Sequence, residues 1–413
     1  MATYNVQLPN PLPAWTGAPA FLQALQQHGG HVVRALSHSP WVTVYLPDSG
    51  VHPAHIAQAF PGVRSVEEDT SCSNCRPTSR MTVRAGASPV TWASQMVGAP
   101  EAHRVTRGQG ARVAIIDTGL SPHEDLRGVR IAAAESLVPG ETVQDQHGHG
   151  TAILGIVAAQ GERLLGLAPD ADVLMLKALS GGGEGMWSWV AAAVDRALDL
   201  QVDVVIMALG GDDESAMLVD GLASLALSGT IAVSPAGNSG VGRLDFPASP
   251  GLPIVAPAVD QGGQRPSWAN WGPWPASPDV AAPGVQVPVL ARRGGYEAMS
   301  GTSMATGMVG GCMALVYAAF PGLRSALAHA LAQDPKEGGE MPAAIAEARR
   351  RLAATSEPLE MQRDLMGYGL INAARLLSLQ ARARAVADSL GVPLAIVAAL
   401  LFFPLVLGRR APR

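Results

Sequence analysis

The sequence predicts an α/β protein in which a parallel β-sheet carries helices on both faces, with a small α+β unit before it and one membrane-spanning helix after it. Apolar strand-like runs alternate with helical runs from residue 92 to residue 378. A shorter pattern of four strands and two helices precedes them, and an uncharged apolar run follows them. The 413 residues, 48% of them hydrophobic, are enough to build more than one core.

The N-terminal segment, residues 1–69, has the order β-α-β-β-α-β. The strands read TYNVQLP, HVVRALS, WVTVYLP and VRSVEED, and the helices read PAFLQALQQHG and HPAHIAQAF. This order is typical of a ferredoxin-like unit. Residues 70–91 are rich in Ser, Pro, Thr and Gly, so we expect a linker there.

The large domain, residues 92–378, contains near-continuous apolar strands. They read ARVAIID, ADVLMLKAL, VDVVIMAL and TIAVSPA, and helical runs such as WSWVAAAVDRALDL lie between them. Strands that are apolar on both faces are typical of a parallel sheet buried between two layers of helices.

Composition and charge exclude several classes of protein. The formal net charge is -5, which argues against a nucleic-acid partner bound through phosphates. Three cysteines are too few for a disulfide scaffold. Cys72 and Cys75 have the spacing of a zinc or redox pair, but no further ligands lie nearby in the sequence. We therefore expect no cofactor and no metal site.

The C-terminal region predicts a membrane anchor. Residues 389–408 are apolar and uncharged over a length within the roughly 17–25 residues that span a bilayer, although a buried C-terminal helix has the same composition. A juxtamembrane stretch, 379–388, precedes the span, and a basic tail, 409–413, follows it. The basic residues of this tail favour a tail in the cytoplasm and a large domain outside the cell. The N-terminus shows no signal-peptide pattern, which favours a cytoplasmic one, and we lean to the latter.

Three residues at strand ends or helix starts predict nucleophilic catalysis. Asp117 ends a buried strand, His149 opens one helical run, and Ser303 opens another. A serine hydroxyl needs a base to become a nucleophile, and an aspartate can orient a histidine for that role. His147 and His149 could instead be a metal pair, but the neighbouring Asp145 alone does not complete a ligand set.

The segments around these residues resemble the motifs of subtilisin-like serine peptidases, the subtilase family, over roughly residues 92–378. The matching segments are Ile116-Asp117-Thr-Gly, His149-Gly-Thr, Ala236-Gly-Asn238, Ala282-Pro-Gly284 and Gly301-Thr-Ser303-Met-Ala. The resemblance implies a serine endopeptidase, a hydrolase. In it Ser303 attacks, His149 acts as base and then acid, Asp117 orients His149, and Asn238 binds the oxyanion with the Ser303 N–H. Residues 1–69 resemble the family's inhibitory propeptide.

The resemblance also implies where substrate binds. Two segments are similar to the strand edges that receive a protein or peptide substrate by β-augmentation: Gly181, Gly182 and Gly183 on one side, and Ala208, Leu209 and Gly210 on the other. Asp245 corresponds to the base of the primary specificity pocket. A carboxylate there would favour arginine before the scissile bond, although Asp245 could instead pair with Arg243 on the surface.

Three further expectations follow from this reading. Self-processing is expected at Arg76, Arg80 or Arg84. Partners would be the substrate, the chain's own propeptide-like unit and membrane lipid. The alternatives are a catalytically silent membrane-bound binding module and a dedicated precursor-maturation protease. Gly307 stands where the family usually has proline, which would affect only the preorganisation of a helix start.

Overall fold

The structure, a computed structural model, describes residues 2–47, 62–74, 78–84, 88–273, 278–332 and 354–378, together with the single positions 56, 58, 60, 349 and 352. The predicted juxtamembrane stretch 379–388, membrane helix 389–408 and tail 409–413 lie outside the described residues, and so does Arg76.

The N-terminal unit is a four-stranded antiparallel sheet with the order β2-β3-β1-β4. Its elements are β1 (Ala2–Gln7), η1 (Leu12–Ala14), α1 (Ala18–Gln27), β2 (His31–Ala35), β3 (Trp41–Leu46) and β4 (Ser65–Glu68). Apolar side chains from α1 and the sheet, including Val6, Phe21, Leu25 and Val44, form a core of its own. This strand order is the ferredoxin-like one that the sequence predicts; the second helix lies mostly outside the described residues.

The large domain is built on a six-stranded parallel sheet with the order β14-β13-β11-β7-β9-β8. The strands are β7 (Arg112–Asp117), β8 (Arg130–Ser136), β9 (Asp172–Lys177), β11 (Val204–Met207), β13 (Ile231–Pro235) and β14 (Ile254–Ala256). Smaller elements around it are α3 (Trp92–Met96), α4 (Ala99–Ala102), η2 (Glu124–Leu126), β15 (Ala258–Val259), β16 (Ala282–Pro283), α9 (Leu323–Ala332) and α11 (Arg363–Met366).

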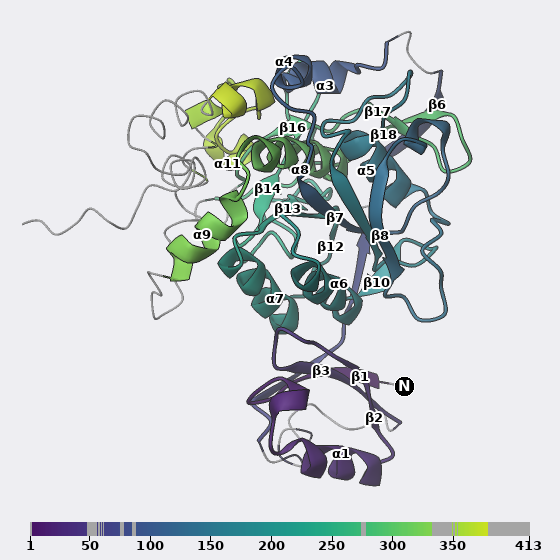
Figure 1. Cartoon of the computed structure of the whole chain (residues 1–413), viewed down its shortest axis with the longest axis vertical. Helices are drawn as coiled ribbons and strands as arrows, with labels where there is room; N and C mark the ends of the chain where they lie inside the picture. Colours follow the sequence, from purple (N-terminus) through teal and green to yellow (C-terminus); the bar gives the residue numbers. More distant parts are fainter. Residues whose placement is uncertain are drawn as a thin grey trace, which may run out of the picture.

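Helices cover both faces of this sheet because successive strand residues point to opposite sides. In β7, Val113 and Ile115 join one buried cluster, while Ala114 and Ile116 join the other. The first cluster contains α5 (His149–Ala158) and α8 (Thr302–Ala319), and the second contains α6 (Trp187–Asp199) and α7 (Ala216–Leu227). Figure 1 shows α6 and α7 on the side of the sheet that faces the N-terminal unit.

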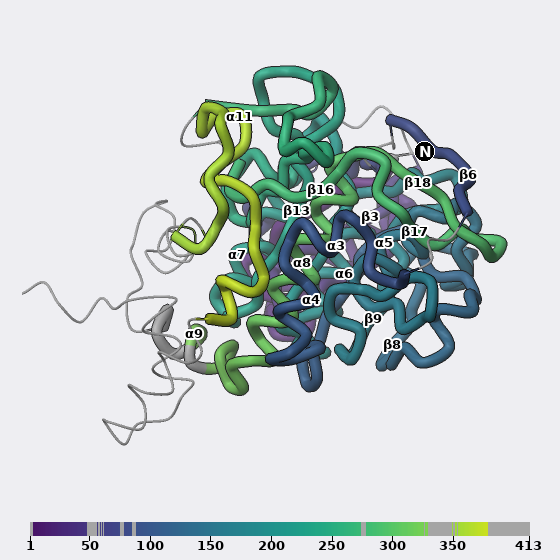
Figure 2. The backbone as a smooth tube through the Cα atoms, turned by 90° about the horizontal axis from the view of Figure 1, so that it is seen from above, coloured from purple at the N-terminus to yellow at the C-terminus, as the bar shows by residue number. Residues whose placement is uncertain are grey.

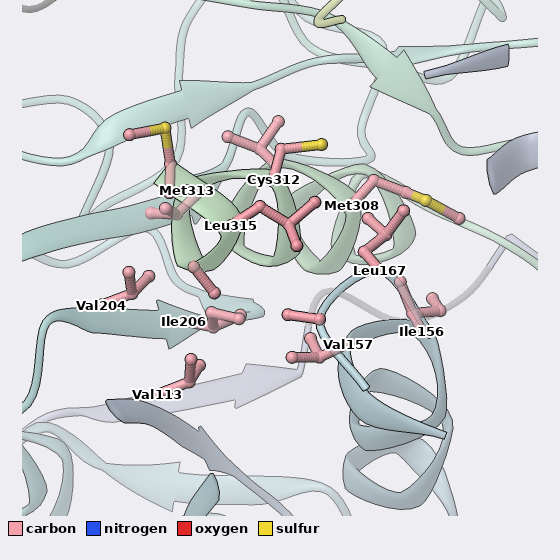
Figure 3. Close-up of a cluster of buried hydrophobic side chains, with 14 of the residues drawn as sticks. Val113, Ile156, Val157, Leu167, Val204, Ile206, Met308, Cys312, Met313 and Leu315 are labelled. Carbon is pink, nitrogen blue, oxygen red and sulfur yellow. The ribbon is translucent and has the colours of Figure 1, made fainter. Parts of the chain in front are cut away.

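The helix α8 lies in the centre of the large domain. It packs over β11 and β13, with Met308, Cys312 and Leu315 among the packed side chains (Figure 3). A Cβ at Gly310 would come within 2.4 Å of the Ile206 side chain, so the small residue allows this close packing. Among the described residues, α8 alone is long and apolar enough to cross a membrane, but 94% of that window is buried inside the protein. It is a core helix.

The segment 70–91, which the sequence predicts as a linker, contains two strands. β5 (Ser71–Asn74) lies between β10 (Glu184–Met186) and β12 (Leu209–Gly210), antiparallel to both. β6 (Ser79–Val83) extends the hairpin of β17 (Val287–Leu290) and β18 (Tyr296–Ser300). Figure 2 shows β6 beside β17 and β18 at one edge of the molecule. The sequence did not predict these two strands, because β5 and β6 are held by backbone hydrogen bonds to strand edges far along the chain.

Candidate active site

Asp117 and His149 form a buried pair at the carboxyl-terminal end of β7, where α5 begins. His149 Nδ1 lies 2.9 Å from each carboxylate oxygen of Asp117, and both side chains are fully buried. Two glycines allow this approach. Gly119 has φ +106° and a Cβ there would lie 2.1 Å from the Val143 carbonyl oxygen, while a Cβ at Gly150 would lie 2.3 Å from the Gly119 oxygen. The two motifs therefore pack backbone against backbone.

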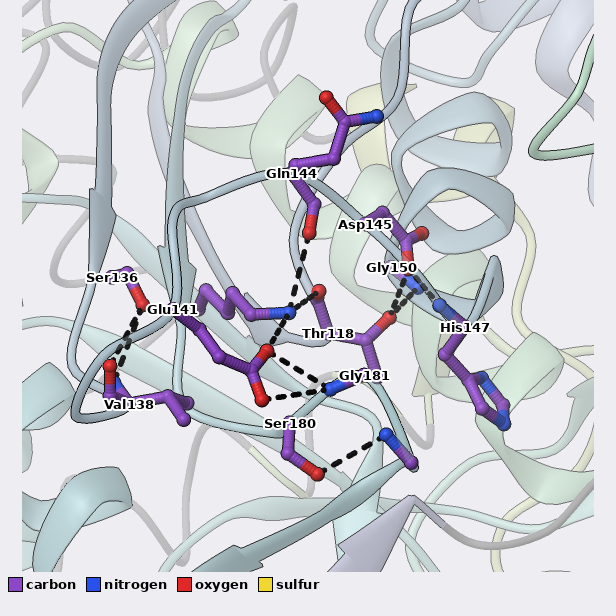
Figure 4. Close-up of polar contacts among 12 residues, drawn as sticks. Thr118, Ser136, Val138, Glu141, Gln144, Asp145, His147, Gly150, Ser180 and Gly181 are labelled. Atoms are coloured by element: carbon purple, nitrogen blue, oxygen red, sulfur yellow. Dashed lines mark hydrogen bonds and ion pairs between the residues drawn. The ribbon is translucent and has the colours of Figure 1, made fainter.

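Asp145 organises the loop that leads to His149. Its carboxylate accepts hydrogen bonds from the N–H groups of His147, Gly148 and Thr151, and from the hydroxyls of Thr151 and Thr118. Figure 4 shows the contacts with His147 and Thr118. Burial alone would raise the pKa of Asp145, but these hydrogen bonds outweigh burial and hold that pKa below its ordinary value. The sequence shows Asp145 only as an isolated acid near the histidines, because the donors that make it important are mostly backbone groups.

Ser303 is the second residue of α8, and its side chain is fully buried. Its Oγ donates to the Ala208 carbonyl oxygen at 3.2 Å. Within the described part of the chain, His149 Nε2 has no hydrogen-bond partner. Catalytic hydrogen bonds are often absent before substrate binds.

Asn238 lies beside the start of α8 and is held there by its carboxamide oxygen. That oxygen accepts from the Thr302 N–H and from the Thr302 hydroxyl, both at 2.9 Å. This oxygen therefore anchors the Asn238 side chain to Thr302, the first residue of α8.

The two predicted substrate edges are present, and the chain's own β5 lies between them. Ser73 is paired with Gly210, and Asn74 is paired with Leu209. On the other side, the Asn74 N–H donates to the Gly183 carbonyl oxygen at 2.9 Å. Ala208, whose carbonyl accepts from Ser303, directly precedes this edge. The structure therefore places β5 between β10 and β12, with Ser303 hydrogen-bonded to the residue that precedes β12.

The other two glycines of the first edge are held by neighbouring side chains. The Gly181 N–H donates to the Glu141 carboxylate at 3.0 Å, and the Gly182 N–H donates to Ser180 Oγ at 3.2 Å (Figure 4). Glu141 in turn lies 3.2 Å from the ammonium group of the buried Lys177. A chain of charged contacts thus ties this edge to the sheet.

Comparison with known proteins identifies the family. Residues 108–364 match the family model described as the subtilase family, peptidase S8. The chain belongs to the subtilase family. It is 36% identical over 260 residues to an alkaline protease of Alkalihalobacillus alcalophilus, covering 62% of this chain and 64% of that protein. It is 38% identical over 234 residues to subtilisin Savinase of Lederbergia lenta, covering 56% and 85% respectively. The chain thus spans slightly under two thirds of the length of the first of these relatives.

In this subtilase Asp245 is a partly buried carboxylate that does not pair with Arg243. Arg243 is exposed and forms its ion pair with Asp212, while its charge acts on Asp245 only at longer range and lowers the pKa of that carboxyl. Asp245 Oδ1 accepts from Asn270 Nδ2 at 2.8 Å, and a Cβ at Gly237, next to Asn238, would lie 2.4 Å from Asp245 Oδ2. Burial, with the nearby charge of Asp212, raises the pKa of Asp245 to about 6.

The arginine candidates for self-processing lie in different places. Arg80 is in β6, where its guanidinium binds Glu297 and donates to the His147 carbonyl oxygen. Arg84 follows the end of β6 and is exposed. The stretch that joins Asn74 to Thr78, whose N–H donates to the Ser300 carbonyl oxygen at 2.7 Å, is the one that contains Arg76.

Proposed function

We propose that this subtilase is a serine endopeptidase in which Asp117, His149 and Ser303 form the triad and Asn238 is the oxyanion donor. The observation that carries the proposal is the buried Asp117–His149 pair at the start of α5, because α5 packs against α8, which begins with Thr302 and Ser303. A buried aspartate that binds Nδ1 fixes the tautomer that leaves Nε2 as the base.

The proposed reaction follows from these positions. Ser303 Oγ gives its proton to His149 Nε2 and attacks the scissile carbonyl carbon. The carbonyl oxygen becomes an oxyanion and accepts from Asn238 Nδ2 and the Ser303 N–H. The loss of one such donor typically costs about 10²–10³-fold in turnover. His149 then gives the proton to the leaving amine, and water cleaves the acyl-enzyme in a second cycle.

The N-terminal unit is proposed to be an inhibitory propeptide. Its support is the position of β5, which follows directly from this unit and occupies the cleft between β10 and β12 in an extended conformation that a substrate would share. We infer that self-cleavage occurs between Asn74 and Thr78, a stretch that contains Arg76. Arg80 and Arg84 lie beyond it, in or after β6.

Asp245 is proposed to select arginine before the scissile bond. A carboxylate beside Gly237 and Asn238 lies next to the proposed oxyanion donor, and it is unpaired with Arg243. A guanidinium can engage such a carboxylate in a bidentate pair.

Membrane tethering through residues 389–408, with the large domain on the cytoplasmic side, is a proposal that rests on the sequence alone. Detergent-dependent release on fractionation, and protection of the large domain from protease added to intact cells, would be the expected results.

The proposed triad is tested by labelling with a serine-directed fluorophosphonate and by hydrolysis of a peptide substrate. Ser303→Ala and His149→Ala should each abolish both signals, whereas His147→Ala is the matched control and should retain most activity. N-terminal sequencing of the active protein beside Ser303→Ala locates self-cleavage. A fully active His149→Ala enzyme, or no labelling of the native chain, would refute the proposal, and the second result would favour a silent binding module.

A further inference from the structure

A basic depression lies beside the proposed catalytic base. It has a volume of about 770 Å³ and its lining is dominated by guanidinium groups. The arginines in the lining are Arg80, Arg84, Arg163, Arg292 and Arg293, and the carboxylate among the described lining residues is Glu297.

Most of these arginines have no acidic partner in the described part of the chain. Glu297 is engaged by Arg80, while no ion pair or side-chain hydrogen bond of Arg163, Arg292 or Arg293 is found there. The whole chain has a formal charge of -5, so this concentration of positive charge is local. A concave surface lined by charges of one sign attracts groups of the opposite sign.

The positive surface continues around the turn that joins β17 to β18. A second depression, of about 810 Å³, shares Arg292 and Arg293 with the first and adds Arg127, together with one carboxylate, Glu124. We define the basic surface by the four of these arginines that lie outside residues 79–84, the segment that contains β6: Arg127, Arg163, Arg292 and Arg293.

The basic surface begins one residue away from His149. A Cβ at Gly148 would lie 2.8 Å from Arg80 Nη2 and 3.2 Å from Arg292 Cβ. The β6 strand marks the path of the chain after the cleavage site. It runs antiparallel to β18, with Ser79 opposite Ser300 and Val83 opposite Tyr296, and so leads from the cleft toward the β17–β18 turn.

We propose that the basic surface selects substrates that carry acidic side chains downstream of the scissile bond, in the places that residues 80–84 occupy in the chain's own segment. This inference rests on the proposed peptidase function and names a substrate class for it. A substrate lying along β18 would bring its downstream residues to Arg292 and Arg293. The chain's own downstream segment carries Arg80 and Arg84 there, so it is a poorer match in charge than an acidic peptide.

The experiment compares three internally quenched peptides that differ only downstream of the scissile bond. They share every residue through the third position after the cut and then carry three Glu, three Gln or three Lys residues. For the native enzyme, kcat/KM should be about tenfold higher for the Glu peptide than for the Lys peptide, since several exposed pairs act together. The preference should shrink at 0.5 M NaCl, where screening extends over only a few ångströms.

Variants then assign the preference to the basic surface. Arg292→Glu combined with Arg293→Glu should reverse the order of the Glu and Lys peptides, and Arg292→Gln combined with Arg293→Gln should bring their ratio close to one. Arg104→Glu is the matched control, because Arg104 is exposed in a loop outside the lining of either depression; it should keep the native ratio.

The results separate this inference from the proposed function. If native enzyme cleaves all three peptides with equal kcat/KM, the inference is wrong and the peptidase function stands. An unchanged ratio in both Arg292/Arg293 double variants would also overturn it. If no peptide is cleaved under any condition, the proposed function itself fails.

Discussion

Two carboxylates of the N-terminal unit contact the starts of the two helices that this unit covers. Glu67 accepts from the Ser215 hydroxyl and from the Ala216 N–H, each at 2.8 Å, at the start of α7. Asp69 accepts from the Ser188 N–H at 3.0 Å and from the Ser188 hydroxyl at 2.6 Å, at the start of α6. If the unit inhibits the enzyme, removal of both carboxylates, by Glu67→Ala with Asp69→Ala, should weaken that inhibition strongly.

The magnitude follows from the type of contact. The N-cap of α6 is Met186, whose side chain makes no capping hydrogen bond, so Asp69 provides the cap that α6 lacks. A hydrogen bond to a charged group contributes about 1.5–3 kcal/mol. Burial raises the pKa of Asp69, which offsets part of its gain, so we use about 1.5 kcal/mol for each carboxylate. The double variant should then lose about 3 kcal/mol, which corresponds to an inhibition constant raised on the order of 100-fold.

The assay adds the separate N-terminal unit, residues 1–74, to processed enzyme and measures the inhibition constant from peptide hydrolysis. Glu68→Ala is the matched control, because Glu68 lies between the two carboxylates but is exposed on the other side of the strand. Far-UV circular dichroism checks that each variant unit is folded. A folded double variant that inhibits within threefold of the native unit would refute the reasoning.

Two further outcomes are expected. The pKa of Asp245 is raised to about 6, so its carboxylate becomes charged between pH 5 and pH 7. Over this range the ratio of kcat/KM for an Arg substrate to kcat/KM for a Leu substrate should rise. Asp245→Ser should lower this ratio and make it independent of pH. Asp145→Asn in a Ser303→Ala background should lower the free energy of unfolding by about 2–4 kcal/mol at pH 7, with Asp213→Asn as a neutral surface control. The pKa of Asp145 is depressed in the folded protein, so the stabilisation by its carboxylate is complete above the unfolded pKa of about 4 and is lost as pH falls through the folded pKa. Urea unfolding at pH 3 should therefore show a smaller difference in the free energy of unfolding between Asp145→Asn and its parent than at pH 7.

The parts of the site that the sequence predicted are those whose signal is local. Asp117 and His149 each stand at a strand end or helix start, next to a glycine whose backbone must approach its neighbour closely. This requirement for glycine can be recognised in the sequence within a few residues of each site residue. The strands of the large sheet could also be predicted, because both of their faces are buried and their sequences are therefore almost continuously apolar.

The parts that the sequence did not predict depend on partners far along the chain. The β5 strand, Ser71–Asn74, is polar and has no apolar alternation, and its existence depends on β10 and β12, which lie more than a hundred residues away. Asp145 matters through backbone donors that any sequence would supply. The basic surface joins arginines as far apart as Arg127 and Arg292, and no short window of sequence contains both.

The segment in the cleft is held differently on the two sides of the proposed cleavage site. Upstream, β5 is bonded through its backbone to β10 and β12, and β4 and Asp69 continue that hold into the N-terminal unit. Downstream, β6 pairs with β18 and Arg80 binds Glu297, but Arg84 lies at a surface that is already positive. Once the peptide bond between the two sides is cut, the upstream contacts remain and the downstream strand is opposed by like charges. Cleavage would therefore free the downstream half of the cleft first, while the upstream half stays occupied until the N-terminal unit leaves.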